Sequence, residues 1–240
     1  ADSFEHKVTR CARRVGGLRR KYALRSTHPT AYNRKIGRVR VTKMSATFAE
    51  DRNVSLPRHR LSVEDYHRMA EAGILGEADR VELIEGELIQ MPPIGAKHAE
   101  VVDYINDVFS RQVDDDKRVR IQNPVRLSDY GELYPDATIL RKRRYFDAHP
   151  GPGDVLLIME VSDSTLPYDR DIKVPLYAAH GILEVWLINI KERCIEIYRN
   201  PSPEERRYQS IQRIERGAVT AANVPEVALS LSELFPGGSD

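Results

Sequence analysis

An unbroken run of five apolar residues, Val155 to Met159, is the feature that most constrains the fold of this sequence. Its length suits a β-strand, and because no polar residue alternates with the apolar ones, both faces of the strand must be covered. The run therefore predicts a central strand with protein packed on both sides. Glu160 follows directly. A carboxylate at the end of a buried strand needs a partner, since an unpaired buried charge is costly.

The segments around this strand alternate between helical and strand-like patterns. Apolar residues at helical spacing, including Val101, Ile105 and Phe109, predict a helix over about residues 96–112. Ser62 and Asp65 have the spacing of a capping box and predict an earlier short helix. Further strands are expected at 81–91 with a turn at 85–86, at 119–127 with an interruption near 123–124, and at 137–140, 183–190 and 195–198, with a short closing segment over 224–235. This order predicts an α/β fold.

A helix is also expected over about residues 168–180, ending at Gly181. Pro175 falls inside this segment. Proline in a helix interior removes a backbone hydrogen bond and costs about 3 kcal/mol, unless it lies in the first turn. The helix must therefore begin late or bend near Pro175.

Charge is divided unevenly along the chain. Residues 1–55 contain 14 Lys and Arg against 4 Asp and Glu, a net charge of +10, whereas residues 56–240 contain 23 against 32, a net charge of −9. We predict a basic, disordered extension over 1–55 and a single folded domain over 56–240. Two interpretations of the extension stay open: a segment upstream of a natural start near Met44, or an arm that binds a phosphate backbone.

Cysteine content and hydropathy indicate the compartment. The two cysteines, Cys11 and Cys194, can form neither a disulfide framework nor a paired zinc motif. No stretch reaches the roughly 20 apolar residues needed to span a bilayer, and no secretory h-region follows the basic start. We expect a cytoplasmic protein without membrane contact.

Three charged residues are of the types that a phosphodiester hydrolysis site needs. Asp136 opens one predicted strand, Glu160 ends the buried strand, and Lys173 follows thirteen residues later on the next helix. Mg²⁺ prefers oxygen ligands and retains several waters, so two carboxylates and a backbone carbonyl suffice to hold it. A lysine can balance charge that develops on the phosphate. These groups can converge if the strand ends and the helix meet.

An ordered set of residues gives the sequence a family resemblance. The set comprises Glu87, His98, Pro135-Asp136, Glu160-Val161-Ser162, Asp169, Lys173, Tyr177 and Glu184-Val185-Trp186. In this order it resembles the Uma-two family of endonucleases, within the PD-(D/E)XK nuclease superfamily, over about residues 61–235.

The resemblance implies a restriction-endonuclease-like fold, a mixed central β-sheet flanked by helices. It also implies Mg²⁺, which Mn²⁺ can replace, bound by Asp136 and Glu160, with the Val161 carbonyl and Glu87 as further expected ligands. Lys173 would be a lysine displaced from its usual position two residues after the glutamate, which here is Ser162. Its long stem allows this displacement. His98 is the fourth expected catalytic residue.

Each assignment has a structural alternative. Asp136 could serve a turn, Glu160 an internal ion pair, and Lys173 a solvated helix-face pair with Asp169. His98 could be only a polar residue in the first turn of a helix. Glu87 could only serve the hairpin turn beside Gly86. Trp186 is expected in the core.

Three function classes follow. The first is a metal-dependent endonuclease acting on nucleic acid, with DNA the expected polymer and a homodimer the expected assembly for cutting two strands. The second is a nuclease-fold protein with weakened catalysis that binds nucleic acid or regulates. The third is another metal-dependent phosphoesterase, because fold does not fix function.

Deleting residues 1–43 is expected to leave the melting temperature nearly unchanged, because this segment has little apolar periodicity to contribute to a core. The same deletion is expected to lower DNA affinity at low salt, since it removes basic side chains. Thermal unfolding of the full and shortened chains tests the first expectation. A large drop in melting temperature would mean that the segment is an integrated element.

Overall fold

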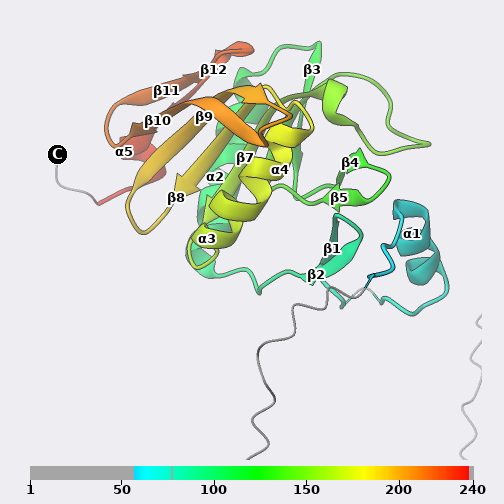
Figure 1. Ribbon diagram of the computed structural model, residues 1–240. Coiled ribbons are helices and arrows are strands. Elements are labelled where there is room, and N and C mark those ends of the chain that lie inside the picture. Colours follow the sequence, from blue (N-terminus) through cyan, green and yellow to red (C-terminus); the bar gives the residue numbers. More distant parts are fainter. Residues whose placement is uncertain (1–56, 77, 238–240) are drawn as a thin grey trace, which may run out of the picture. The chain divides into compact units, whose positions relative to one another are not determined.

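A mixed six-stranded sheet forms the centre of the computed structural model, which describes residues 57–76 and 78–237 (Figure 1). Its strand order is β10-β9-β8-β7-β6-β3, and within it only β7 and β8 run parallel. The strands are β3 (Lys117–Ile121), β6 (Ala137–Arg141), β7 (Val155–Ser162), β8 (Glu184–Asn189), β9 (Cys194–Ser202) and β10 (Arg207–Ile214). The predicted α/β class is confirmed.

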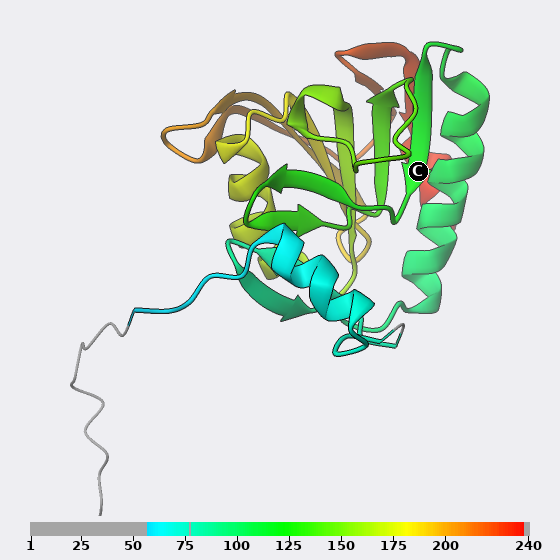
Figure 2. The same ribbon diagram turned by 90° about the vertical axis from the view of Figure 1, so that its right-hand side faces the viewer.

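The apolar run forms β7, which lies between β6 and β8 and is buried along its whole length. Leu157 and Met159 pack with α2 (Ala96–Gln112) on one face of the sheet. Ile158 packs with α4 (Val174–Ala179) on the other face. The two helices cover opposite sides of the sheet (Figure 2), as the continuous apolarity of the run predicts.

The connection from β7 to β8 contains three successive helical pieces. The first is α3 (Leu166–Tyr168), the second a π-helical turn, η2 (Asp169–Lys173), and the third α4. Pro175 lies in the first turn of α4, directly after the π-helical turn. An α-helix interior would require Pro175 to donate to the carbonyl of Asp171, which proline cannot do. The helical segment nevertheless does not start late: its backbone is continuous from Leu166, a π-helical turn precedes Pro175, and Gly181 (φ +71°) follows its end.

A smaller four-stranded sheet, of order β2-β1-β5-β4, carries the first helix. Its strands are β1 (Val81–Ile84), β2 (Glu87–Gln90), β4 (Val125–Ser128) and β5 (Gly131–Leu133). Val63 and Tyr66 of α1 (Val63–Glu71) pack against Leu83. The predicted capping box of Ser62 and Asp65 and the hairpin turn at residues 85–86 are both confirmed.

One sequence prediction is wrong, and another gains detail from the structure. Residues 119–127 do not form one interrupted strand, because β3 and β4 belong to different sheets. Gln122 adopts a positive φ (48°) and Pro124 follows, so the chain turns away between them. The segment 224–235 is a strand, β12 (Val224–Ser230), paired with β11 (Ala218–Ala221) and followed by α5 (Leu231–Leu234).

The predicted basic extension, residues 1–55, lies outside the described residues. Within the described part of the chain, no helix is long and apolar enough to cross a membrane.

Candidate active site

A cavity of about 690 Å³ opens beside the carboxyl end of β7. The residues of interest that line it come from separate elements: β1, α2, the start of β6, β7 and η2. They are Glu82, His98, Asp136, Glu160, Val161 and Lys173. The structure thus brings together every expected site residue except Glu87.

Glu160 lies on the α4 side of β7 and is 2% exposed. Its Oε1 accepts a hydrogen bond from the Tyr177 hydroxyl and lies 3.3 Å from Nζ of Lys173. Burial raises the pKa of Glu160 well above 4.5, against the opposing effect of the Lys173 ammonium. Both contacts fall on Oε1, which leaves Oε2 as the oxygen to offer a cation.

Asp136 directly precedes β6 and holds the ends of two neighbouring strands together. Its Oδ2 accepts the backbone N–H of Val161 at 2.8 Å, and its Oδ1 accepts the Gln122 amide at 3.2 Å. Nε2 of His98 lies 3.1 Å from Oδ2. Burial favours a higher pKa for Asp136. Two effects outweigh it and hold that pKa below 3.8: the hydrogen bond from His98 with its charge, and the hydrogen bond from the Val161 N–H.

Lys173 is buried, with its Nζ 3.3 Å from Oε1 of both Glu82 and Glu160. Burial alone lowers the pKa of Lys173, but the surrounding carboxylates raise it above 10.5, so the ammonium stays charged. The alternative of a solvated pair between Lys173 and Asp169 is wrong. Asp169 instead accepts hydrogen bonds at 2.6 Å from the hydroxyls of Ser162 and Thr165.

His98 lies in the first turn of α2, where its side chain reaches Asp136. Its pKa is raised above 6.5, because the Asp136 carboxylate outweighs the opposite effect of burial. Nδ1 is buried and has no hydrogen-bond partner among the described residues. The contact of His98 with the site is therefore made through Nε2.

Glu82, which the sequence analysis did not select, takes the place expected for Glu87. Glu82 is 1% exposed and accepts the Tyr168 hydroxyl at 2.8 Å and the Tyr134 backbone N–H at 3.2 Å. Glu87 lies on the edge strand β2, exposed and paired with Arg58 at 2.6 Å, and does not line the cavity. The sequence signal that could have identified Glu82 is its position as an acidic residue inside the short apolar strand 81–84.

The donor set of the cavity fits a hard divalent cation. Its described lining contains six carboxylates and two permanently charged cations, Arg80 and Lys173. The carboxylates are Asp79, Glu82, Asp136, Glu160, Asp163 and Asp169. This excess of negative charge favours a cation, and Mg²⁺ prefers carboxylate and carbonyl oxygens. Asp136, Glu160 and the Val161 carbonyl could hold it.

Fold and site together define a nuclease-like α/β protein. The model of the Uma2 family, described as "Putative restriction endonuclease", matches residues 63–238, and the chain belongs to this family. The predicted family is therefore confirmed. No curated protein matches the chain.

The fold has a counterpart among solved structures. A crystal structure of a "putative nuclease belonging to DUF820" from Anabaena variabilis ATCC 29413 is similar, with a TM-score of 0.52 and 19% sequence identity. The match covers 73% of this chain and 97% of that chain. At this identity it supports the fold alone, and it agrees with the predicted mixed sheet flanked by helices.

The His98–Asp136 pair gives a pH-dependent prediction. In Asp136→Asn the pKa of His98 is expected to fall, because burial continues to disfavour the imidazolium while its main partner has lost its charge. Nuclear magnetic resonance titration of the imidazole measures this pKa. An unchanged value would show that Asp136 does not control the protonation of His98.

The same pair sets a window of stability. The raised pKa of His98 contributes stability fully present below 6.5 and lost as pH rises through the folded-state pKa. The lowered pKa of Asp136 contributes stability present above 3.8 and lost as pH falls through its folded-state pKa. The difference in unfolding free energy between parent and Asp136→Asn should therefore be largest between about pH 4 and 6.5.

Proposed function

We propose that this protein is a metal-dependent endonuclease that hydrolyses phosphodiester bonds in nucleic acid, with DNA as its substrate. The observation that carries the proposal is the convergence of Asp136, Glu160 and Lys173 in one cavity whose carboxylates outnumber its cations. Hydrolysis needs a cation site, an activated water and positive charge near the phosphate. This cavity has residues suited to each.

In the proposed reaction a water oxygen bonds to phosphorus, the bond from phosphorus to one ester oxygen breaks, and that oxygen receives a proton. Mg²⁺ bound by Asp136, Glu160 and the Val161 carbonyl would polarise the phosphate and lower the pKa of water. Mn²⁺ has similar ligand preferences and can replace it.

The side chains of the chain itself have separate tasks in this proposal. Lys173, held by Glu82 and Glu160, keeps a positive charge at the cavity wall for the phosphate oxygens. Tyr177 orients the Glu160 carboxylate through its hydroxyl. His98 lines the cavity with its Nε2 3.1 Å from Oδ2 of Asp136, and its imidazole can exchange a proton with that carboxylate.

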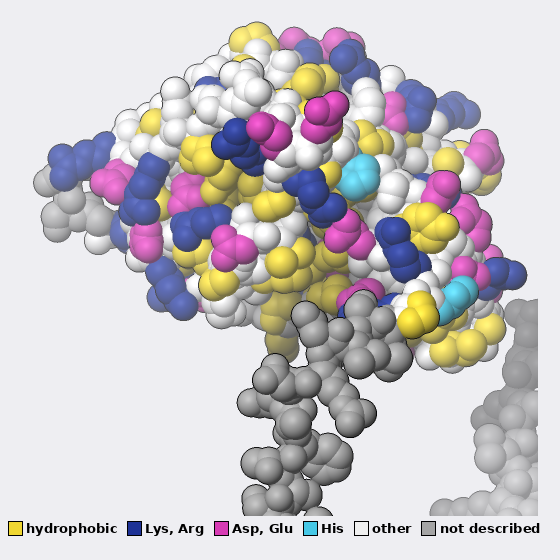
Figure 3. All heavy atoms as spheres, viewed as in Figure 1, with side chains coloured by type: hydrophobic (Ala, Val, Ile, Leu, Met, Phe, Trp, Pro, Cys, Tyr) yellow, Lys and Arg dark blue, Asp and Glu magenta, His cyan; other side chains and the backbone are white. Residues whose placement is uncertain are grey.

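Surface charge suggests how nucleic acid would be held. On the face drawn in Figure 3, Lys and Arg side chains are interspersed with Asp and Glu and do not gather into one basic patch. The cations at the cavity and the basic residues 1–55 would both contribute to affinity in the proposed complex. A homodimer would supply one such site for each strand of a duplex.

Two observations favour the alternative, a nucleic-acid-binding or regulatory protein with weakened catalysis. The Lys173 ammonium is already engaged by two carboxylates, and Ser162 occupies the position where the simplest superfamily motif has lysine. An engaged lysine stabilises a transition state less than a free one. The substitutions below separate the two functions.

Asp136→Asn and Glu160→Gln are each expected to reduce DNA cleavage by at least about 100-fold and to weaken Mn²⁺ binding, because each removes a charged oxygen ligand with little change of shape. Plasmid nicking in Mg²⁺, Mn²⁺ or EDTA measures the first effect, and calorimetric titration with Mn²⁺ the second.

Glu87→Gln is the matched control, because it neutralises a carboxylate outside the cavity. It should cleave and bind Mn²⁺ like the parent. Unchanged Mn²⁺ affinity in both Asp136→Asn and Glu160→Gln would remove these residues from the metal site.

Lys173→Ala is expected to lower the single-turnover cleavage rate by roughly 100-fold to 1,000-fold, about 2.7 to 4 kcal/mol of transition-state stabilisation. Metal affinity should fall far less, since lysine is not a ligand. Single-turnover conditions at saturating protein and metal isolate chemistry from binding and product release.

Arg170→Ala provides the comparison for Lys173→Ala. Arg170 lies in the same π-helical turn but pairs with Glu196, outside the cavity. Both variants must first show parental circular dichroism, because removing Lys173 leaves two buried carboxylates unpaired. A folded Lys173→Ala that cuts DNA at more than about a third of the parent rate would exclude the lysine from catalysis.

A further inference from the structure

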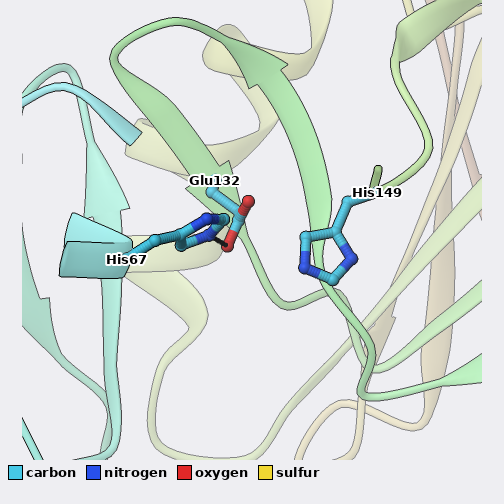
Figure 4. A group of neighbouring side chains, drawn as sticks. All are labelled: His67, Glu132 and His149. Carbon is cyan, nitrogen blue, oxygen red and sulfur yellow. Dashed lines mark hydrogen bonds and ion pairs between the residues drawn. The ribbon is translucent and has the colours of Figure 1, made fainter. Parts of the chain in front are cut away.

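A second cluster of ligand-type side chains lies outside the cavity. It joins His67 of α1, Glu132 of β5 and His149, which precedes the short helix η1 (Pro152–Asp154). One potential ligand atom from each residue lies within 4.8 Å of the other two. Figure 4 shows the Glu132 carboxylate between the two imidazole rings. None of the three residues lines the candidate active site.

Glu132 is the unusual member of the cluster. Its side chain is 1% exposed, and its Oε1 lies 2.9 Å from Nε2 of His67. Its Oε2 is buried and has no hydrogen-bond partner among the described residues. A buried carboxylate oxygen without a partner is costly, and such atoms in folded proteins usually have a hydrogen bond or a cation. A cation bound by Glu132 would supply the missing partner.

We propose that His67, Glu132 and His149 bind a divalent transition-metal ion of the Zn²⁺ type. Two imidazoles and one carboxylate suit Zn²⁺, whereas Mg²⁺ prefers an all-oxygen set. Tetrahedral zinc places its ligand atoms about 3.3 Å apart. The three ligand atoms here lie within 4.8 Å of one another, so side-chain rotations that shorten these distances by about 1.5 Å would form the site.

Solvent can complete the coordination. The His67 side chain is 43% exposed, so one position on the ion would face water. Three protein ligands with an open fourth position are found in zinc sites that retain a water molecule.

The ion would join three segments that are distant in sequence. α1 and β5 belong to the small sheet and its helix, while His149 lies on the connection between β6 and β7. In the described structure the Arg126 N–H donates to the carbonyl of Pro150, which already fixes this connection to β4. A metal at His149 would add a second, stronger attachment. The expected consequence is a more stable fold.

The test is Zn²⁺ binding by the full chain, measured by equilibrium dialysis with metal analysis and by thermal unfolding. Parent protein should bind one Zn²⁺ more than His149→Ala does. With Zn²⁺ at about 100 times its dissociation constant, the parent melting temperature should rise by roughly 5 to 10 °C. Glu132→Gln should lose this rise as well.

Two controls isolate the site. His59→Ala removes an exposed histidine outside the cluster and should bind Zn²⁺ like the parent. Asp136→Asn should also keep the additional Zn²⁺ while losing Mn²⁺ affinity, so failure of this proposal and failure of the proposed nuclease function are distinguishable. With Co²⁺ in place of Zn²⁺, the parent should show the visible absorption of a tetrahedral site. His149→Ala and Glu132→Gln, which each lack one ligand, should not.

Equal Zn²⁺ binding by the parent and folded His149→Ala would overturn the proposal. So would loss of the additional Zn²⁺ in Asp136→Asn with its retention in His149→Ala, because the ion would then occupy the cavity beside β7.

Discussion

The buried ammonium of Lys173, held between Glu82 and Glu160, is the interaction on which the rest of the structure depends. It connects the small sheet, the central strand β7 and the π-helical turn. None of the three charges is stable out of water alone, and breaking a buried pair by removing one partner typically costs about 3 to 5 kcal/mol. The contact therefore links the geometry of the cavity to the two sheets, which also pack through a shared apolar cluster.

The π-helical turn explains how a lysine from the crossover reaches this position. Pro175 has no N–H to donate to the carbonyl of Asp171, so the α-helical hydrogen-bond pattern cannot continue there. Residues 169–173 form a π-helical turn, which is wider than an α-helical one. Asp169 at the start of the turn bonds to Ser162 and Thr165, while Lys173 at its end bonds to the two glutamates. Lys173 and Pro175 are thus two parts of one local structure.

Local patterns predict most of the elements and part of the site. The apolar run of β7 identifies Glu160, because a carboxylate attached to such a strand must find a partner. The same reasoning applies only weakly to Glu82, because its strand is short and its partners Tyr168 and Lys173 lie far along the chain. Glu87 was favoured by its place in the family pattern, but it lies on an edge strand. The separation of β3 from β4 likewise depends on pairing with distant strands.

The positions of the cavity residues along the chain have a consequence for synthesis. Glu82, His98, Asp136, Glu160 and Lys173 span some 90 positions, and β8 must still be made before β7 gains its parallel neighbour. A chain emerging from the ribosome therefore carries the individual acidic residues long before it can assemble them, because non-local contacts form late in folding. Until residues up to Asn189 have been made, β7 lacks its parallel neighbour, and the proposed cation site cannot yet be complete.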